Sequence, residues 1–271
     1  MAGKASEFTG DIPRNYNDGL GPVLFDPYAD DLVKRAKALK PVRVLELAAG
    51  TGIVTRKLRD ALPKATSIVA SDLNQAMLDV ASPLFETSEN ISFEVVDAMS
   101  IPKADDSFDL VTSQFGIMFM PDKVASLREA RRVLQPGGTY LFNTWGSWDG
   151  NPWAGLGHKA VEGFFPGEAP GFYKVPFHYH DPKEIKRDLK AAGFKNVKIK
   201  ELKKAGHISS HEVLAHAAVF GNPLADEIRA LNTGVTPEQA QEAVRAALET
   251  AFGPAPTKMP LMALVVTATA P

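Results

Sequence analysis

The chain has 271 residues, of which 45% are hydrophobic and 23% charged, a balance typical of one large folded domain or two small ones. The formal net charge of −2 gives no electrostatic reason to expect a polyanionic partner such as nucleic acid. Cysteine is absent, which excludes disulfides, thiolate nucleophiles and cysteine-ligated metal sites. No segment matches a signal peptide or the roughly 20 apolar residues of a membrane helix, so we expect a cytoplasmic protein without a membrane span.

The first 146 residues divide into a leader and an alternating region. Residues 1–40 are predicted to form an N-terminal cap, with a polar lead-in followed by a helix over 27–40. Strands are then predicted at residues 43–47, 67–71, 91–96, 108–113 and 139–144. Helices are predicted between them at residues 53–62, 75–84 and 123–134. This alternation over residues 41–146 predicts an α/β fold with a mostly parallel sheet and helices on both faces.

The composition shifts after residue 146, where Gly, Pro and aromatic residues become frequent. Residues 147–203 are expected to hold loop, a helix that starts at Asp181, and a sixth strand over 196–202. Residues 204–256 carry three helical patterns, the last with Thr236 and Gln239 in capping-box positions. We expect these helices to form a lid over the ligand end of the sheet. Residues 257–271 are expected to hold a final buried strand.

A turn of small residues, 48–52, follows Glu46 at the end of the first predicted strand. Small residues let the backbone pass close to a bound ligand, and ligands of open α/β sheets lie outside the carboxyl ends of the strands. The turn contains Gly50 and Gly52, but Thr55 stands where a dinucleotide-binding motif needs its third glycine. The turn therefore predicts a cofactor site and does not favour a dinucleotide.

Acidic residues also follow the next two predicted strands. The carboxylate of Asp72 could accept hydrogen bonds from both hydroxyls of a ribose. Asp97, with the backbone N–H of Ala98, could bind the edge of an adenine, and the thioether of Met77 suits an adenine face. Each residue also has a simpler interpretation: Glu46 as a strand-end acid, Asp72 as a helix cap, Asp97 as a turn cap and Met77 as a core residue.

Taken together and in order, these motifs resemble the class I S-adenosylmethionine-dependent methyltransferases, and within them the group of ubiquinone and menaquinone biosynthesis. The resemblance rests on residues 46–52, Asp72, Asp97–Ala98, the strand end at 108–115 and the helix exit at 132–138. It implies a Rossmann-like sheet of seven strands in the order 3-2-1-4-5-7-6, with strand 7 antiparallel. It also implies S-adenosyl-L-methionine as the cofactor and a small, apolar or aromatic molecule as the methyl acceptor.

The resemblance further implies which residues hold the cofactor. The turn would approach its methionine part, Glu46 would place its ammonium through water, and Asp72 would hold the ribose. Leu73 and Met77 would contact the adenine faces, and Tyr16 would fold over the bound molecule. Ala48 stands where the family often has glycine, and an alanine is tolerated there if its φ is negative. The expected cofactor residues are Tyr16, Glu46, Ala48, Gly50, Thr51, Gly52, Asp72, Leu73, Met77, Asp97, Ala98, Met99, Gln114 and Phe115.

Methyl transfer is an in-line displacement that depends chiefly on alignment, and it needs a base only when the acceptor must lose a proton. No clear catalytic residue is visible. His178 and His180 are candidate bases, although His180 also fits the start of the next helix. Trp145, Trp148 and Trp153 are candidates for the wall of an acceptor pocket, or for cover over a hydrophobic patch or an oligomer interface. No metal site is expected, because the remaining histidines lack a clear third ligand.

Two other functions remain open at this point. A module that binds the cofactor without transferring a methyl group would also lack an obvious base. A nicotinamide-dependent oxidoreductase would have a Tyr-x-x-x-Lys pair, and Tyr179 and Lys183 have that spacing, but Pro182 interrupts the helix that the motif requires. The acceptor's identity, the atom methylated and the oligomeric state do not follow from the sequence.

Overall fold

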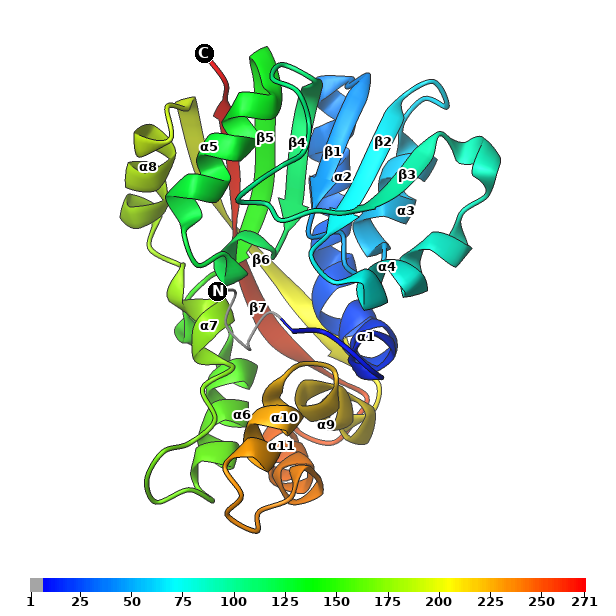
Figure 1. The fold of residues 1–271 in the computed structure, drawn as a ribbon. Helices are drawn as coiled ribbons and strands as arrows, with labels where there is room; N and C mark the ends of the chain where they lie inside the picture. Colours follow the sequence, from blue (N-terminus) through cyan, green and yellow to red (C-terminus); the bar gives the residue numbers. More distant parts are fainter. Residues whose placement is uncertain (1–6) are drawn as a thin grey trace.

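The computed structural model describes residues 7–271, which form a seven-stranded sheet with helices on both faces (Figure 1). The strand order is β3-β2-β1-β4-β5-β7-β6. Strands β1 to β5 are parallel, and β7 is antiparallel to both β5 and β6. This confirms the predicted fold. The strands are β1 Arg43–Leu47, β2 Ser67–Asp72, β3 Ile91–Val95, β4 Phe108–Gln114, β5 Leu134–Trp145, β6 Lys195–Ile208 and β7 Thr257–Thr269.

Several helices begin at a residue whose side chain caps the first turn. Asp122 accepts a hydrogen bond from the N–H of Ala125, Asp181 caps its helix in the same way, and Thr236 forms the predicted capping box. None of the helices within residues 7–271 is long and apolar enough to cross a membrane. The α-helices are α1 Ile12–Asn15, α2 Asp26–Leu39, α3 Ile53–Ala61, α4 Gln75–Ala81, α5 Lys123–Val133, α6 Pro152–Glu162, α7 Lys174–His178, α8 Pro182–Ala191, α9 His211–Phe220, α10 Leu224–Ala230 and α11 Pro237–Phe252.

The described part of the N-terminal segment differs from the predicted polar lead-in. Residues 12–25 are helical, with α1 followed by the π-helical segment η2, Tyr16–Phe25. Pro22 and the glycines of η2 hide the helical signal in the sequence, although Leu20, Leu24 and Phe25 are buried. A Cβ at Gly19 would collide with Ala217, so η2 packs directly against α9. The segment is therefore part of the packed fold.

Strand β6 forms one outer edge of the sheet and is longer than predicted. It pairs with β7 from Lys195 to Ile208, because β7 itself begins at Thr257. Five lysines lie along this strand, at positions 195, 198, 200, 203 and 204, and most of their side chains are exposed to solvent. By contrast, β7 is nearly continuously buried, as expected for a strand covered on both faces.

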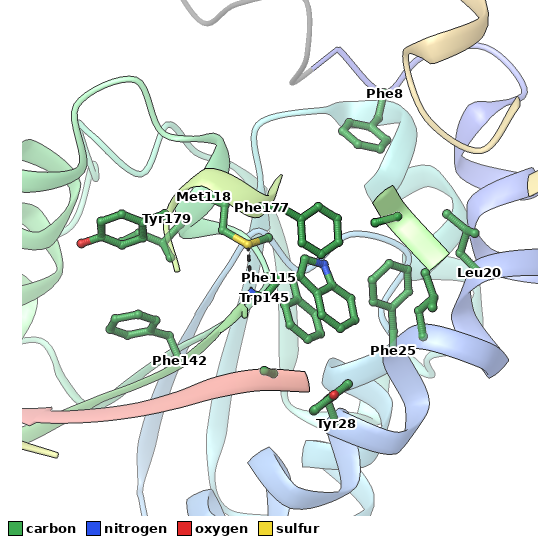
Figure 2. Packing of buried hydrophobic residues seen from close by; sticks show 14 of the residues in the cluster. Phe8, Leu20, Phe25, Tyr28, Phe115, Met118, Phe142, Trp145, Phe177 and Tyr179 are labelled. Atoms are coloured by element: carbon green, nitrogen blue, oxygen red, sulfur yellow. Dashed lines mark hydrogen bonds between the residues drawn. The ribbon is translucent and has the colours of Figure 1, made fainter. Parts of the chain in front are cut away.

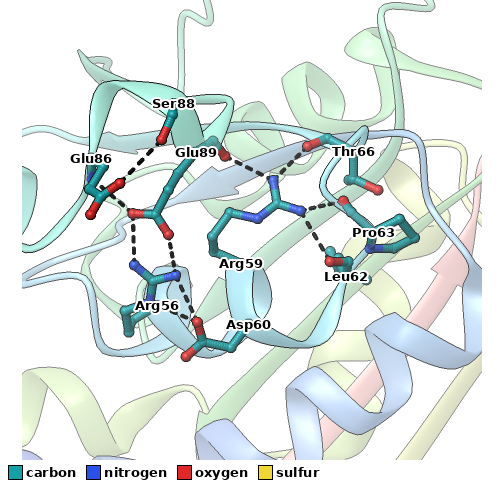
Figure 3. A network of polar contacts seen from close by, with 9 residues as sticks. All are labelled: Arg56, Arg59, Asp60, Leu62, Pro63, Thr66, Glu86, Ser88 and Glu89. Atoms are coloured by element: carbon teal, nitrogen blue, oxygen red, sulfur yellow. Dashed lines mark hydrogen bonds and ion pairs between the residues drawn. The ribbon is translucent and has the colours of Figure 1, made fainter.

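A buried arginine ties the end of α3 to the start of β2 (Figure 3). Arg59 is 6% exposed, and its guanidinium donates to the backbone oxygens of Thr66, Glu89 and Leu62 at 2.7, 3.0 and 3.1 Å, and also to Pro63. The nearby Arg56 instead pairs with the carboxylates of Glu89 and Asp60 at the surface. Both arginines therefore stabilise this part of the fold, Arg59 through buried hydrogen bonds to backbone oxygens and Arg56 through ion pairs at the surface.

Most helices that follow β5 and β6 gather beyond one end of the sheet, whereas α8 lies beside the sheet and packs against α5. Figure 1 shows α6, α9, α10 and α11 together there, and α11 packs against both α9 and α6. Of the predicted insertion 204–256, Asn222 reaches the cavity described below. The lid function of these helices remains a proposal.

Candidate functional site

One cavity of about 310 Å³ lies at the carboxyl ends of the parallel strands, within the size range of small-molecule sites. The loops after β1, β2, β3 and β4 and the end of β5 all contribute to its lining. Glu46, Thr51 and Gly52 lie outside the lining. The eleven other expected cofactor residues line it: Tyr16, Ala48, Gly50, Asp72, Leu73, Met77, Asp97, Ala98, Met99, Gln114 and Phe115.

The turn after β1 is tighter than expected. Ala48 has a φ of +54°, so the condition for an unstrained alanine at this position is not met, and Gly50 and Gly52 also have positive φ. The bend is held because Ala49 donates to the oxygen of Ser71 at 2.8 Å. A Cβ on Gly116 would lie 2.5 Å from the Cβ of Ala48, which shows how closely the β4 exit passes the turn. An alanine therefore occupies a conformation that costs it about 1–2 kcal/mol relative to glycine.

Asp72 joins this turn to the start of α4. One carboxylate oxygen accepts from the N–H of Gly50 at 2.9 Å, and the other accepts from the backbone N–H of Asn74 at 2.9 Å. The side chain is 7% exposed, and burial raises its pKa, an effect that these hydrogen bonds oppose. The N-cap of α4 is Asn74 and not Asp72, so the carboxylate of Asp72 fixes the turn that precedes the helix. The same residue also lines the cavity.

Glu46 lies behind the turn and is 1% exposed. Its carboxyl accepts a hydrogen bond from the hydroxyl of Thr55 at 2.7 Å. Burial raises the pKa of Glu46 to about 8; the Thr55 bond opposes the rise and the charge of Asp72 adds to it. The carboxyl is therefore largely protonated at neutral pH until a positive group comes near. Its role toward the cofactor ammonium remains a proposal.

The expected adenine residues lie at the same end of the cavity as Asp72. Asp97 accepts from the N–H of Met99 at 2.8 Å, which orders the loop after β3. Met77 and Ala98 are buried and Leu73 is half-exposed, and all three line the cavity. We call this part, formed by Asp72, Leu73, Met77, Asp97 and Ala98, the acidic end.

The rest of the cavity is walled by rings. Trp145, at the end of β5, stacks on Phe115 with centroids 3.9 Å apart and an interplanar angle of 10°. Phe177 stacks beside Trp145 at 5.9 Å, and Tyr28 meets it edge-on; Figure 2 shows these rings together with Phe25. We call this part the aromatic chamber, formed by Phe25, Phe115, Trp145, Trp153, Phe172, Tyr173 and Phe177.

Of the three tryptophans considered for an acceptor pocket, Trp145 and Trp153 line the cavity, the latter from α6. Several other lining residues were not predicted from the sequence: Phe172 and Tyr173 come from the loop before α7, and Asn222 comes from the loop after α9. The signal in the sequence was only the cluster of aromatic residues after β5. The other unpredicted lining residues include Phe8, Leu20, Leu24, Phe25, Met118, Phe119, Met120, Pro176 and Phe177.

Three further predicted residues, the two candidate bases and one tryptophan, lie outside the cavity lining. His178 and His180 are exposed, and their Nδ1 atoms lie 3.1 and 2.7 Å from the backbone oxygens of Val175 and Phe177. The neighbouring Phe177 and Tyr179 are buried instead, and neither histidine lines the cavity. Trp148 packs against the ring of His158 at 5.2 Å, away from the cavity lining.

The cavity has few titratable groups. Among the described residues that line it, Asp72 and Asp97 are the only carboxylates, and none is histidine, lysine, arginine or glutamate. Burial raises the pKa of Tyr16 and of Tyr173, so both phenols stay protonated near neutral pH. Within residues 7–271, no cluster of three potential metal ligands is present.

Comparison with known proteins places this geometry in context. Residues 44–138 match the family described as methyltransferase domain. A demethylmenaquinone methyltransferase of Staphylococcus saprophyticus is 28% identical over 172 residues, which cover 58% of this chain and 72% of that protein. A ubiquinone/menaquinone biosynthesis C-methyltransferase of Neisseria meningitidis is 33% identical over 144 residues, covering 52% and 59%.

Solved structures share the fold at lower identity. The YcgJ protein of Bacillus subtilis is 19% identical with a TM-score of 0.59, and the match covers 89% of this chain and 97% of that one. A phosphoethanolamine N-methyltransferase of Haemonchus contortus, in complex with phosphomonomethylethanolamine and S-adenosylhomocysteine, has a TM-score of 0.60 at 16% identity. That match covers 96% of this chain and 57% of the other.

Proposed function

Because this chain is a class I S-adenosylmethionine-dependent methyltransferase, we propose that the cavity binds the cofactor at its acidic end and a small acceptor in its aromatic chamber. The observation that carries the proposal is that both parts belong to one cavity. A methyl donor and an acceptor held in one enclosed space can be aligned for in-line displacement.

The residues of the acidic end fit the cofactor's nucleoside. The carboxylate of Asp72 accepts from the N–H of Gly50 and from both the backbone and the side-chain N–H of Asn74, which leaves acceptor capacity on Oδ2 for one ribose hydroxyl. Asp97 and the Ala98 N–H are proposed to hold the adenine edge, with Leu73 and Met77 on its faces. When bound, the cofactor supplies an activated methyl group on a positively charged sulfur.

The walls of the aromatic chamber lack charged side chains, and this limits which acceptors can bind. A phosphate, carboxylate or ammonium would enter a space without an oppositely charged side chain beyond Asp72 and Asp97, and burying an unpaired charge is costly. We infer an uncharged, flat, apolar acceptor, of which a reduced quinone ring, as in the names of the relatives above, is one example. No base lines the chamber, so the acceptor's nucleophilic atom must lose its proton to water or carry none.

Calorimetry with S-adenosylhomocysteine tests the cofactor part of this proposal. Wild-type protein should bind, and Asp72→Ala should weaken binding by about 1–3 kcal/mol, the cost of removing a buried hydrogen-bond partner. Asp226→Ala is the control and should leave the affinity unchanged, because the Asp226 side chain is exposed on α10. An affinity that is the same in Asp72→Ala and wild type would remove Asp72 from the ribose role.

A turnover screen tests the acceptor part. Quinols, phenols, amines and carboxylates would each be mixed with S-adenosylmethionine, and release of S-adenosylhomocysteine would be measured. We expect release with uncharged aromatic compounds and none with amines or carboxylates. Tight cofactor binding without release for any compound would favour the alternative of a non-catalytic binding module.

A further inference from the structure

Asn74 stands at the start of α4, yet its side chain does not cap that helix. An asparagine at this position usually accepts a hydrogen bond from a backbone N–H of the first helical turn. Here its Oδ1 accepts from the backbone N–H of Phe8 at 3.3 Å, and its Nδ2 donates to Oδ1 of Asp72 at 3.3 Å. The side chain of Asn74 therefore connects the carboxylate of the acidic end with the N-terminal segment.

Phe8 forms part of the outer wall of the cavity. The residues on either side of it are exposed, whereas Phe8 is 8% exposed and lines the cavity, so its ring points inward from a segment at the surface. The ring meets Tyr16 and Phe119 edge-on, with centroids 5.9 and 6.0 Å away. Phe119 stacks in turn with Phe172 of the aromatic chamber. Phe8 thus reaches the acidic end through its N–H and the aromatic chamber through its ring.

The two oxygens of the Asp72 carboxylate have different partners. Oδ1 accepts from the backbone N–H of Asn74 at 2.9 Å and from its side chain, and Oδ2 accepts from the N–H of Gly50. Asp72, Asn74 and Phe8 all line the cavity. A ribose hydroxyl bound at Oδ2 would fix the plane of the carboxylate and so hold Oδ1 toward Asn74. A hydrogen bond to an ionised carboxylate is also stronger than one between neutral groups.

We propose that Asn74 is a positioning residue that couples cofactor binding at Asp72 to closure of the cavity by Phe8. This inference rests on the proposed function, because the cofactor must occupy the acidic end. A ligand shifts a conformational equilibrium only if it interacts more favourably with one of the two states, and the connection from Asp72 through Asn74 to Phe8 supplies that difference. The chamber is thereby closed around an acceptor chiefly when the methyl donor is present.

Hydrogen exchange of the Phe8 amide tests this coupling. Exchange would be followed residue by residue by mass spectrometry on the full chain, with and without saturating S-adenosylhomocysteine. In the wild type, S-adenosylhomocysteine should slow exchange at Phe8 about tenfold, the effect of strengthening one hydrogen bond. Asn74→Ala should lose this slowing, although calorimetry should still detect binding of S-adenosylhomocysteine.

Gln75→Ala is the matched control. Gln75 also carries a side-chain amide in the first turn of α4, but it is exposed, donates to Asp79 and does not line the cavity. Its replacement should leave the slowing at Phe8 as in the wild type.

Asn74→Asp separates the two bonds of the side chain. Aspartate keeps an acceptor for the N–H of Phe8 and loses the donor for Asp72. This variant should protect the Phe8 amide without S-adenosylhomocysteine and should lose the further slowing with it.

Four results would overturn the inference. Wild-type slowing in Asn74→Ala would show that the ligand holds Phe8 without Asn74. Wild-type slowing in Asn74→Asp would show that the bond to Asp72 is not used. Loss of S-adenosylhomocysteine binding in both variants would assign Asn74 to the cofactor site alone. Binding to the wild type without slowing at Phe8 would overturn the inference and leave the proposed function standing, whereas absence of binding to the wild type would overturn the proposed function itself.

Discussion

The buried carboxyl of Glu46 can be tested by the substitution Glu46→Gln. The side chain is 1% exposed and accepts from the Thr55 hydroxyl at 2.7 Å. Glutamine has the same shape, and its amide oxygen can accept the same bond, but it cannot ionise. The variant therefore isolates the titration of this one group.

The raised pKa of Glu46 makes the stability of the protein depend on pH. The ordinary pKa of a glutamate side chain is 4.5, which we take for the unfolded chain, and the pKa of Glu46 in the folded protein is about 8. Between these values the folded protein holds a proton that the unfolded chain has lost, so the free energy of unfolding falls as the pH rises. The contribution of Glu46 is complete below the lower value and lost above the upper one. At about 1.4 kcal/mol for each pH unit, the total fall is at most about 5 kcal/mol.

Urea denaturation of the wild type and Glu46→Gln, at several values from about pH 5 to about pH 8, would measure this fall. The wild type should lose several kcal/mol relative to the variant over that range. Glu201→Gln removes one exposed carboxylate on β6 and is the control for net charge. Parallel pH dependences in the wild type and Glu46→Gln would refute the raised pKa.

The same variant tests the proposed link between Glu46 and the cofactor. A bound cation near the carboxyl would lower its pKa, so binding near neutral pH should release a proton. Calorimetry in buffers with different heats of ionisation would measure this release. It should be present in the wild type and absent in Glu46→Gln. Release of the same size in both proteins would mean that the proton comes from another group.

Three further substitutions probe the turn and the framework. Gly116→Ala would push a methyl group against Ala48 and should weaken S-adenosylhomocysteine binding in calorimetry at least about tenfold, whereas Gly167→Ala, which points into open space, should not. Ala48→Gly should raise the free energy of unfolding in urea by about 0.5–1 kcal/mol, because it relieves the positive φ; a loss of stability would contradict this. Arg59→Met leaves four backbone oxygens without their donor and should cost about 3 kcal/mol or more in urea denaturation, against at most about 1 kcal/mol for Arg56→Met at the surface. Similar losses in the two arginine variants would show that burial of Arg59 is not what matters.

The sheet could be predicted because its signals are local. Each strand of the alternating region is a short apolar run bounded by turn residues, and the order of the strands followed from the family resemblance. The acids after β2 and β3 could be placed for the same reason, since the ends of adjacent parallel strands meet at one edge of the sheet. Asp72 and Asp97 therefore line one cavity, as the spacing indicated.

The tryptophans after β5 were candidates for the wall of an acceptor pocket, but the rest of the aromatic chamber could not be predicted because its residues come together only through tertiary packing. Phe25 lies in η2, Trp153 in α6 and Tyr173 in the loop before α7. The positions of His178 and His180 in the sequence suited a catalytic base. Which side chains of a short segment point inward depends, however, on which of them pack in the core, and here Phe177 is buried. The positive φ of Ala48 could not be predicted, because the surrounding residues impose this strained backbone conformation and the amino-acid type alone does not indicate it.

The lysines of β6 affect whether the protein can associate with other copies of itself through this edge strand. An outer strand of 14 residues offers unpaired backbone groups that another strand could join. Lys195, Lys198, Lys200 and Lys203 are exposed along this strand. A second molecule that approached edge to edge would bring its own row of ammonium groups against them, and like charges on facing strands repel. The positive charge of this long edge strand therefore opposes strand pairing between molecules, and with it the formation of continuous intermolecular sheets.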